Sequence, residues 1–291
     1  MSVITNREEF LFLYDVKDAN PNGDPLDENK PRIDEETGIN IVTDVRLKRT
    51  IRDFLFNFKE HNGSNGKDIF VRSKESEKGG VQDGKERASN FENDAESILK
   101  QCIDIRLFGG VIPLDKDSIK FTGPIQLKMG RSLHNVELKH IRGTGAFGSK
   151  AGAKQQTFRE EYVLPYSLIA FYGVVNENAA KATQLSEEDV KQFYEAMWEG
   201  TNNLISRSKM GHRSRLLVRL KHEKNHFFIG DLDKYITINK KSDKTDLKLR
   251  DVSDFTLDLS KLSEVISTYN DEIKEVKLKK EPRVTIEGWD H

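Results

Sequence analysis

Residues 15–58 read DVKDANPNGDPLDENKPRIDEETGINIVTDVRLKRTIRDFLFNF, which takes an apolar strand through a long polar loop into a basic helix. Positions 20–25 are Asn-Pro-Asn-Gly-Asp-Pro, residue types that favour turns over sheet pairing. Thr43 is placed to cap a helix that begins at Asp44. The predicted helix buries one apolar face, formed by Leu47, Ile51, Phe54, Leu55 and Phe58. Its other surface carries the cations Arg46, Lys48, Arg49 and Arg52. So many exposed cations need acidic neighbours or a polyanion.

The order of predicted elements favours an α+β domain of the ferredoxin-like kind. Residues 10–16 are apolar on both alternating faces, which is typical of a central strand covered on both sides. After the basic helix we expect a strand over 118–129 and a glycine-rich hairpin over 133–160. A buried strand over 162–175, which Pro165 interrupts, follows the hairpin. The order ends with a helix capped by Ser186 and Asp189 and a strand over 215–222. This is the β-α-β-β-α-β order of a ferredoxin-like domain with large insertions.

The segments outside that order have weaker signals. Residues 59–91 are polar with little periodicity and predict a loop or small subdomain. Asn93 is expected to cap a short helix, and 104–109 reads as a short strand and turn. Near the end we expect a strand region over 226–238, an amphipathic helix from Leu259 to Ile273 and a strand over 283–286.

Composition indicates one elaborated, soluble domain. The chain has 291 residues, of which 33% are charged, and acids and bases nearly cancel at a net charge of −1. The overall balance therefore gives no nucleic-acid signal. Cys102 is the single cysteine, so an internal disulfide is excluded, and we expect a buried thiol. The sequence has no membrane-spanning run and no signal peptide, and the cytoplasm is the expected location.

Two short motifs imitate ligand sites. Asp18-x-Asn20-x-Asn22-Gly23 matches the first half of a calcium loop, but Asn29 stands where a bidentate Glu is required. The glycines of residues 143–148 match a dinucleotide fingerprint, but without a buried strand before them or a clear helix after them. We expect neither calcium nor a nucleotide cofactor.

The sequence carries no catalytic pattern. The seven histidines lack metal-ligand spacing, and no Ser-His or Cys-His arrangement can be inferred. His134 and His140 in the predicted hairpin, and His212 in a basic loop, are expected to be solvated. We therefore expect no catalytic residue, no metal and no cofactor.

Cations concentrate in three segments, residues 46–52, 131–159 and 207–221. The ferredoxin-like plan can bring these segments together along one face. Such convergence suits a phosphodiester backbone better than a small anion. The stacked sheet aromatics of RNA-recognition motifs are absent, which favours tracking of the backbone over reading of bases. Ordinary solvated charge is the alternative.

Several ordered motifs resemble one family. They are Asn20-Pro-Asn-Gly-Asp-Pro25, Pro31-Arg-Ile-Asp34, Thr37-Gly38, Val42-Thr-Asp-Val45, Leu47-Lys-Arg49, Asp104-x-Arg106-x-Phe108-Gly109, Gly123-Pro-x-Gln-Leu127 with Arg131-Ser132, and Val163-x-Pro-Tyr166. This series resembles the Cas7 family of the RAMP superfamily, the backbone subunit of type I CRISPR interference (Cascade) complexes, in its I-B or I-C branch.

The resemblance implies a fold and a set of partners. The fold is a modified RNA-recognition-motif palm (about 8–58, 103–132 and 161–222) with a finger insertion (about 59–102), a thumb hairpin (about 133–160) and a C-terminal extension (223–291). The implied partners are CRISPR guide RNA, target DNA through the guide, further copies in a head-to-tail filament and other Cascade subunits, with no membrane. Base pairing would then supply sequence specificity.

The resemblance and the basic segments together give the expected contacts. The residues expected to bind RNA are Asn20, Asn22, Arg46, Lys48, Arg49, Arg52, Arg106, Arg131, Ser132, Lys154, Arg159, Arg207, Lys209, Met210, Arg213 and Arg215. Leu138 or Phe147 of the thumb is expected to wedge against an unstacked base. The alternative is a type III-like endoribonuclease that uses a loop aspartate, Asp18, Asp24 or Asp34.

Overall fold

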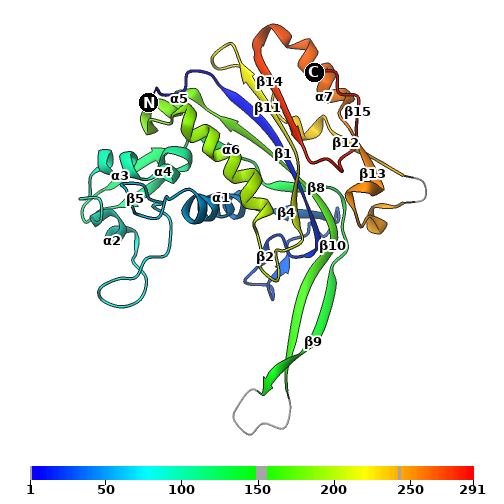
Figure 1. Cartoon of the computed structure of the whole chain (residues 1–291), viewed down its shortest axis with the longest axis horizontal. Helices are drawn as coiled ribbons and strands as arrows, with labels where there is room; N and C mark the ends of the chain where they lie inside the picture. Colours follow the sequence, from blue (N-terminus) through cyan, green and yellow to red (C-terminus); the bar gives the residue numbers. More distant parts are fainter. Residues whose placement is uncertain (1, 149–155, 242–243) are drawn as a thin grey trace.

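The computed structural model describes residues 2–148, 156–241 and 244–291. A large antiparallel sheet forms its centre, with helices on one face and smaller elements on the other (Figure 1). In spatial order its strands are β14 (Ile273–Lys280), β11 (His212–His222), β1 (Glu8–Ala19), β10 (Gln156–Val175), β8 (Gly130–Asn135) and β4 (Ile39–Val42). Two more strands pair with β10, β7 (Ile125–Leu127) and β9 (Lys139–Gly148).

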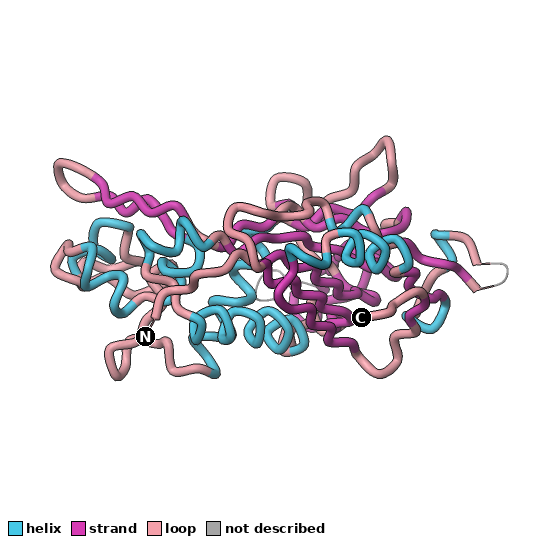
Figure 2. The backbone as a smooth tube through the Cα atoms, turned by 90° about the horizontal axis from the view of Figure 1, so that it is seen from above, coloured by secondary structure: helices cyan, strands magenta, loops and turns pink. Residues whose placement is uncertain are grey.

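Strand β1 is covered on both faces, as its sequence predicts. Phe10, Phe12 and Tyr14 belong to one core cluster, whereas Leu11 and Leu13 belong to the other. The first cluster is closed by the helices α1 (Asp44–Phe58), α5 (Glu177–Thr183) and α6 (Glu187–Asn202). Figure 2 shows helices lying beside the strands of the sheet.

The second face is closed by the C-terminal part of the chain. It contributes α7 (Ser260–Thr268), four 3₁₀ turns, and a small sheet of β12 (Thr237–Lys240), β13 (Phe255–Asp258) and β15 (Ile286–Glu287). Its buried residues Leu232, Phe255 and Leu262 pack with Leu11 and Leu13 of β1.

A smaller unit with its own core lies beside α1 and α6 (Figure 1). It contains α2 (Gly84–Ser89), α3 (Ala95–Gln101), α4 (Ile103–Phe108) and the hairpin of β5 (Gly109–Pro113) and β6 (Ser118–Thr122). Phe70, Phe91 and Ile98 are central in that core. Cys102 is buried there, and burial raises the pKa of its thiol.

The helix caps follow the sequence at two of three sites. The Thr43 side chain accepts a hydrogen bond from Arg46 N, and Ser186 and Asp189 form a capping box, as predicted. The third prediction is wrong by one residue, because Asp94 caps α3 through Ser97 N and Asn93 has a φ of 54°.

Other boundaries differ from the predictions. Residues 103–108 form α4, not a strand, because Ile103 and Leu107 both pack into the first core at helical spacing. The strand expected over 118–129 divides at Gly123 into β6 and β7, and Pro165 lies within an uninterrupted β10. Most of 226–238 is irregular, with β12 beginning at Thr237.

The C-terminal helix also ends earlier than predicted, at Thr268. The lysine-rich residues 273–280 then form β14, an edge strand with polar alternate positions that carried little strand signal.

Candidate nucleic-acid interface

Three segments converge at one end of β1: the loop after that strand, the start of α1, and the loop between α6 and β11. Asn20 N donates to Ser208 O at 2.9 Å, and Lys17 N donates to Gly211 O at 3.1 Å. A Cβ at Gly211 would lie 1.8 Å from the Lys17 carbonyl oxygen, so only glycine allows this approach. The two loops are thus held together by backbone contacts.

Asn22 fixes the start of α1 in the same place. Its Oδ1 accepts from both the backbone N and the Oγ1 of Thr43, each at 2.9 Å. The side chain of Asn20 donates to Asn29 O at 2.7 Å and is buried. Both asparagines were predicted to bind RNA, and their side chains hold the loops around the interface.

Arg46 and Lys209 form the cationic centre of the interface. Arg46, in the first turn of α1, donates to Thr50 Oγ1 at 3.1 Å, and Lys209 donates to the carbonyl oxygen of Asn20. The described part of the chain places no carboxylate in an ion pair with either cation. Burial, together with the positive charge of Arg46, lowers the pKa of Lys209 to about 8. The pair therefore carries positive charge that an anionic ligand would stabilise.

A stacked pair of rings lies next to Lys209. His212 of β11 stacks on Tyr14 of β1, with ring centroids 5.7 Å apart. Its Nδ1 lies 2.6 Å from Lys209 O, which makes Nδ1 the donor in the neutral ring. Burial and the neighbouring Lys209 lower the pKa of His212 to about 3, so this histidine is neutral at physiological pH.

The histidine predictions are corrected by this geometry. His212 and His134 were expected to be solvated, but both are buried. His134 accepts from Leu168 N at 3.2 Å and lies 2.9 Å from Asn135 O. His140 stacks on Tyr162 at 4.6 Å near the base of the hairpin. The sequence could not show that His212 is buried beside Lys209. The ring that His212 stacks on belongs to Tyr14, which is almost 200 residues away in the chain.

The other cations of α1 have acidic or backbone partners. Lys48 pairs with Asp44 at 2.8 Å, and Arg49 pairs with Asp53 at 2.8 Å. Arg52 is buried, pairs with Asp104 at 2.9 Å and lies over the Phe108 ring. The acidic neighbours that the helix required are therefore present for three of its four cations.

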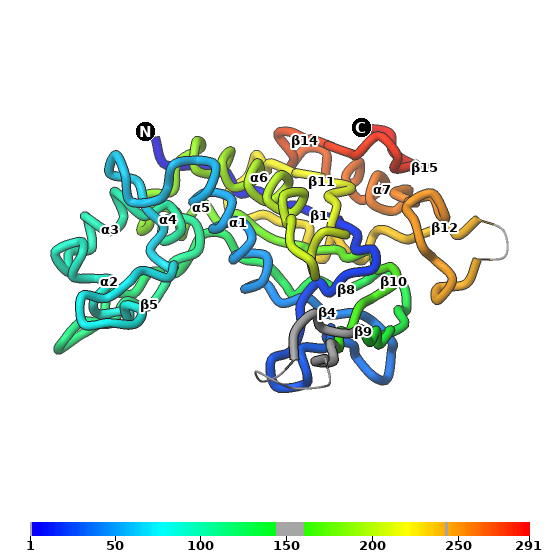
Figure 3. The backbone as a smooth tube through the Cα atoms, turned by 60° about the horizontal axis from the view of Figure 1, so that its bottom comes forward, coloured from blue at the N-terminus to red at the C-terminus, as the bar shows by residue number. Residues whose placement is uncertain are grey.

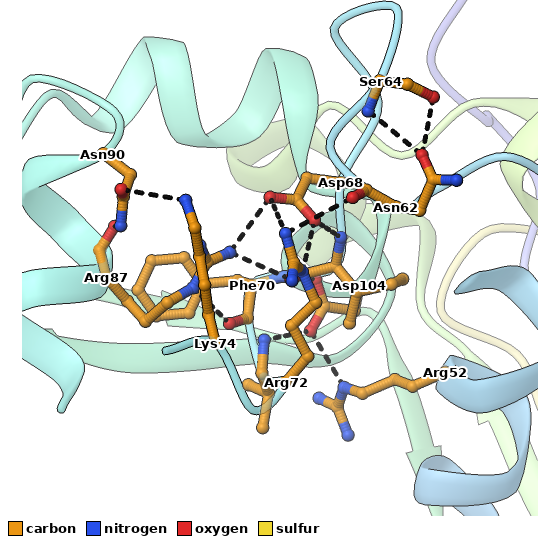
Figure 4. Close-up of polar contacts among 12 residues, drawn as sticks. Arg52, Asn62, Ser64, Asp68, Phe70, Arg72, Lys74, Arg87, Asn90 and Asp104 are labelled. Atoms are coloured by element: carbon orange, nitrogen blue, oxygen red, sulfur yellow. Dashed lines mark hydrogen bonds and ion pairs between the residues drawn. The ribbon is translucent and has the colours of Figure 1, made fainter. Parts of the chain in front are cut away.

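Figure 4 shows why Arg52 belongs to the fold. The wholly buried Asp104 carboxylate accepts from Phe70 N at 2.7 Å and Val71 N at 3.1 Å, besides its bond to Arg52. Nearby, Asp68 pairs with Arg72 and Arg87. These contacts join α1 to the smaller unit.

Three further predicted residues also serve the fold. Arg106 makes two hydrogen bonds to Asp189, at 3.0 and 2.7 Å. Arg215 is buried between Asp15 and Glu281, at 2.8 and 2.7 Å. The Ser132 hydroxyl accepts from Asn40 N and donates to His134 O, again in a buried position.

The remaining predicted residues are accessible or undescribed. Met210 and Arg213 are exposed, Arg131 lies 3.8 Å from Asp34, and Arg207 pairs with Glu161. Leu138 is 36% exposed. Lys154 and the side chains of Phe147 and Arg159 lie outside the described residues.

The hairpin of β9 and β10 extends away from the sheet (Figure 1), and Arg207 pairs with Glu161 at its base. Segment 20–40 lies beside its base (Figure 3), where Tyr162 donates to Glu28 Oε2 at 2.6 Å. Farther along, Arg142 pairs with Glu160 at 3.1 Å. The glycines of residues 143–148 lie on strand β9 and not at a turn from a strand into a helix, so the dinucleotide fingerprint is not formed.

The described residues offer little support for the alternative sites. Within the described ranges, no three His, Cys, Asp or Glu side chains gather to hold a metal ion. Asp24 accepts from Leu26 N and lies 3.4 Å from Arg32, and Asp34 accepts from Glu36 N. Each of these carboxylates thus stabilises a turn. Among the described helices, none combines the length and apolar character required to cross a membrane.

Comparisons with known proteins point to one family. A family model described as CRISPR-associated protein Cas7 matches residues 6–260. A protein from Haloferax volcanii, "CRISPR-associated protein Cas7", is 32% identical over 299 residues, covering 92% of this chain and 85% of that protein.

Two solved structures are similar to this chain. A chain of a "CRISPR RNA-guided surveillance complex, pre-nicking" aligns with a TM-score of 0.52 at 11% identity, covering 79% of this chain and 81% of that chain. A chain of a "CRISPR RNA-guided surveillance complex" gives a TM-score of 0.45 at 14% identity, covering 92% and 87%. The first similarity supports the α+β fold with its large antiparallel sheet.

Proposed function

The chain belongs to the Cas7 family of CRISPR-associated proteins, and we propose that it binds a CRISPR guide RNA as a non-catalytic backbone subunit of a type I interference (Cascade) complex. The observation that carries this proposal is the pair Arg46 and Lys209. These two cations lie where three segments meet, and neither has a carboxylate partner among the described residues. A phosphodiester backbone supplies the missing negative charge without any reading of base sequence.

The proposed RNA path follows the accessible cations around this pair. Lys209 and Arg46 form its centre, and Met210 and Arg207 extend it along the loop between α6 and β11. Arg213 lies beyond this loop, at the start of β11. Arg131 is half exposed on β8, the strand that pairs with β10 of the hairpin. Asn20 and Asn22 shape the loops, whereas Arg52, Arg106, Ser132 and Arg215 act through the fold. Lys48 and Arg49 would bind RNA only by exchanging their carboxylate partners.

We further propose a ferredoxin-like palm made of β1, α1, β8, β10, α6 and β11. The antiparallel order β11-β1-β10-β8, with α1 and α6 on one face, supports this plan. Residues 59–102 would be the finger, 133–160 the thumb and 223–291 the C-terminal extension.

The thumb would contact a neighbouring copy, so that copies polymerise head to tail along the guide. Such an interface does not close on itself and produces a filament. The guide would pair with target DNA, and other Cascade subunits would end the filament.

The test uses the variant Arg46→Gln/Lys209→Gln and the matched control Lys116→Gln/Lys120→Gln, which removes two exposed lysines of the β5–β6 hairpin region. We expect the first variant to bind single-stranded RNA at least tenfold more weakly in a filter-binding titration at 0.1 M salt. The slope of log K against log salt should also become about 1.4 less negative, for two lost phosphate contacts. Equal binding by both variants would refute the proposed site.

A further inference from the structure

A second cationic cavity lies beside the start of β11, where the edge strand β14 ends. Its volume is about 400 Å³, and its walls are the end of α6, the start of β11 and residues 279–283. Its charged lining includes Arg213, Arg215, Lys279, Lys280 and Arg283, against two acids, Glu199 and Glu281. The cavity is therefore basic in a chain whose net charge is −1.

The end of β14 creates this cavity. Strand β14 pairs with β11 as far as Lys280, which stands opposite Leu216. Glu281 N then donates to Arg215 O at 2.9 Å, and the chain turns away from the sheet. Arg213 and Ser214 consequently have no strand beside them on that edge. Ser214 N is satisfied by Asn202 Oδ1 at 2.9 Å, which closes the cavity against α6.

Two of the five cations lack an acidic partner. Arg215 pairs with Asp15 and Glu281, Lys279 lies 3.6 Å from Glu199, and Arg283 pairs with Asp251. In the described part of the chain, the Arg213 side chain has no hydrogen bond or ion pair. Lys280 donates only to the carbonyl oxygen of Val284, at 3.2 Å. An anion in the cavity would thus meet two uncompensated positive charges.

We propose that this cavity binds a backbone phosphate of a nucleic-acid strand, at a site separate from Arg46 and Lys209. Lys279 also lines an adjoining cavity of about 530 Å³, where Arg219 pairs with Glu8 and Lys277 pairs with Glu275. The α6 wall from Tyr194 to Asn202 spans about 12 Å, enough for roughly two nucleotides.

Continuity with the first interface favours a nucleic acid over an acidic protein segment. Arg213 lies four residues after Lys209, so the cavity continues the cationic track of the first interface at the start of β11. Along α6, Lys279 lies 4.4 Å from the Trp198 ring and Arg219 lies 3.8 Å from the Tyr194 ring. These two cations also have acidic partners, Glu199 and Glu8, so the uncompensated charge is that of Arg213 and Lys280.

The experiment compares Arg213→Gln/Lys280→Gln with the control Lys116→Gln/Lys120→Gln in the full chain. Both variants neutralise two cations, and neither touches the buried Asp15–Arg215–Glu281 contacts. Binding of three probes is titrated from 0.05 to 0.3 M salt: single-stranded RNA, single-stranded DNA and duplex DNA. Arg46→Gln/Lys209→Gln is measured in parallel, so that loss of the first interface is distinguished from loss of this one.

We expect the cavity variant to bind at least one probe three- to tenfold more weakly at 0.1 M salt. For that probe the salt slope should become less negative by about 0.7 per lost contact on single strands, or about 0.9 on duplex DNA. The affected probe identifies the source of the phosphate. Unchanged affinity and slope for all three probes would overturn the proposal. Displacement of the affected probe by a polyglutamate peptide at equal charge concentration would also overturn it, in favour of an acidic protein partner.

Discussion

At the scale of single residues, an acidic partner distinguishes two arginines of helix α1. Arg46 and Arg52 are six positions apart on one helix and were predicted to act alike. Arg52 is buried against Asp104, whereas among the described residues the Arg46 side chain has only the Thr50 hydroxyl as a partner. The difference depends on Asp104, 52 residues away, which lies on a segment whose sequence suggested a strand. Ion pairs of this kind depend on the tertiary structure, and the sequence around Arg52 does not reveal them.

The lowered pKa of Lys209 predicts a pH-dependent affinity for RNA. At its pKa of about 8, half of the free protein has a neutral Lys209, and bound phosphate favours the charged amine. Binding therefore takes up a proton, and affinity should fall up to about tenfold from pH 7 to pH 9. Filter binding with an adenine-only RNA measures this change, because its bases do not titrate in that range.

The variant Lys209→Arg is the control, since arginine stays charged and should remove the pH dependence. The unfolding free energy of the wild-type protein should move in the opposite direction. The unfolded chain binds more protons between the lowered pKa of Lys209 and its ordinary pKa of 10.5, so stability should rise with pH across that window. Equal pH slopes for both proteins would exclude Lys209 from the RNA contact.

The Arg52–Asp104 pair predicts a large loss of stability when the arginine is removed. In Arg52→Ala the wholly buried Asp104 keeps only its two backbone donors. Removing one partner of a buried ion pair costs about 3–5 kcal/mol, which urea unfolding would detect. Lys191→Ala, which breaks an exposed pair with Glu188, should cost less than about 1 kcal/mol. Similar costs for both variants would show that Asp104 is satisfied without Arg52.

At the scale of elements, periodicity predicted the buried strands and the long helices, and failed where an element lies at an edge. The double-faced β1 and the capped α1 and α6 have strong apolar patterns, and their predictions are confirmed. Strand β14 has lysines at half of its eight positions, because its edge faces solvent. Helix α4 is too short for its period to distinguish it from a strand.

We predict that the hairpin of β9 and β10 is needed for assembly of copies on RNA but not for folding. Replacing residues 142–160 by a short Gly-Ser turn keeps the Ile141–Glu161 pair, and with it the partner of Arg207. No residue of the three core clusters is removed, so thermal unfolding should be unchanged. We expect a monomer that binds RNA weakly and forms no filaments in negative-stain microscopy.

A matched variant would replace the β5–β6 turn, residues 114–117, by the same Gly-Ser turn. That change should leave filaments on RNA intact. If regular filaments also form without the β9–β10 hairpin, the contact between copies lies elsewhere on the surface.

At the scale of the whole molecule, the family assignment and the physical interpretation support each other through different residues. The family motifs around Asn20, Asn22 and Thr43 build the turn that positions α1. Arg46 and Lys209, which have no carboxylate partner among the described residues, come from segments more than 160 residues apart. Several residues expected to bind RNA, among them Asn22 and Arg52, also hold the fold together, which the sequence alone did not show.

The last prediction is that this chain alone does not cleave RNA. A type III-like mechanism needs a loop aspartate free to act on the scissile phosphate or its metal ion. Asp24 and Asp34 instead accept backbone hydrogen bonds within their own turns, and each lies within 4 Å of an arginine. Asp18 is exposed near the end of β1 and has a φ of 48°. Labelled RNA complementary to a bound guide, incubated with Mg²⁺, should therefore remain intact on a denaturing gel. Cleavage at regular intervals that disappears in Asp18→Asn, but persists in Asp115→Asn on the distant β5–β6 turn, would establish the endoribonuclease instead.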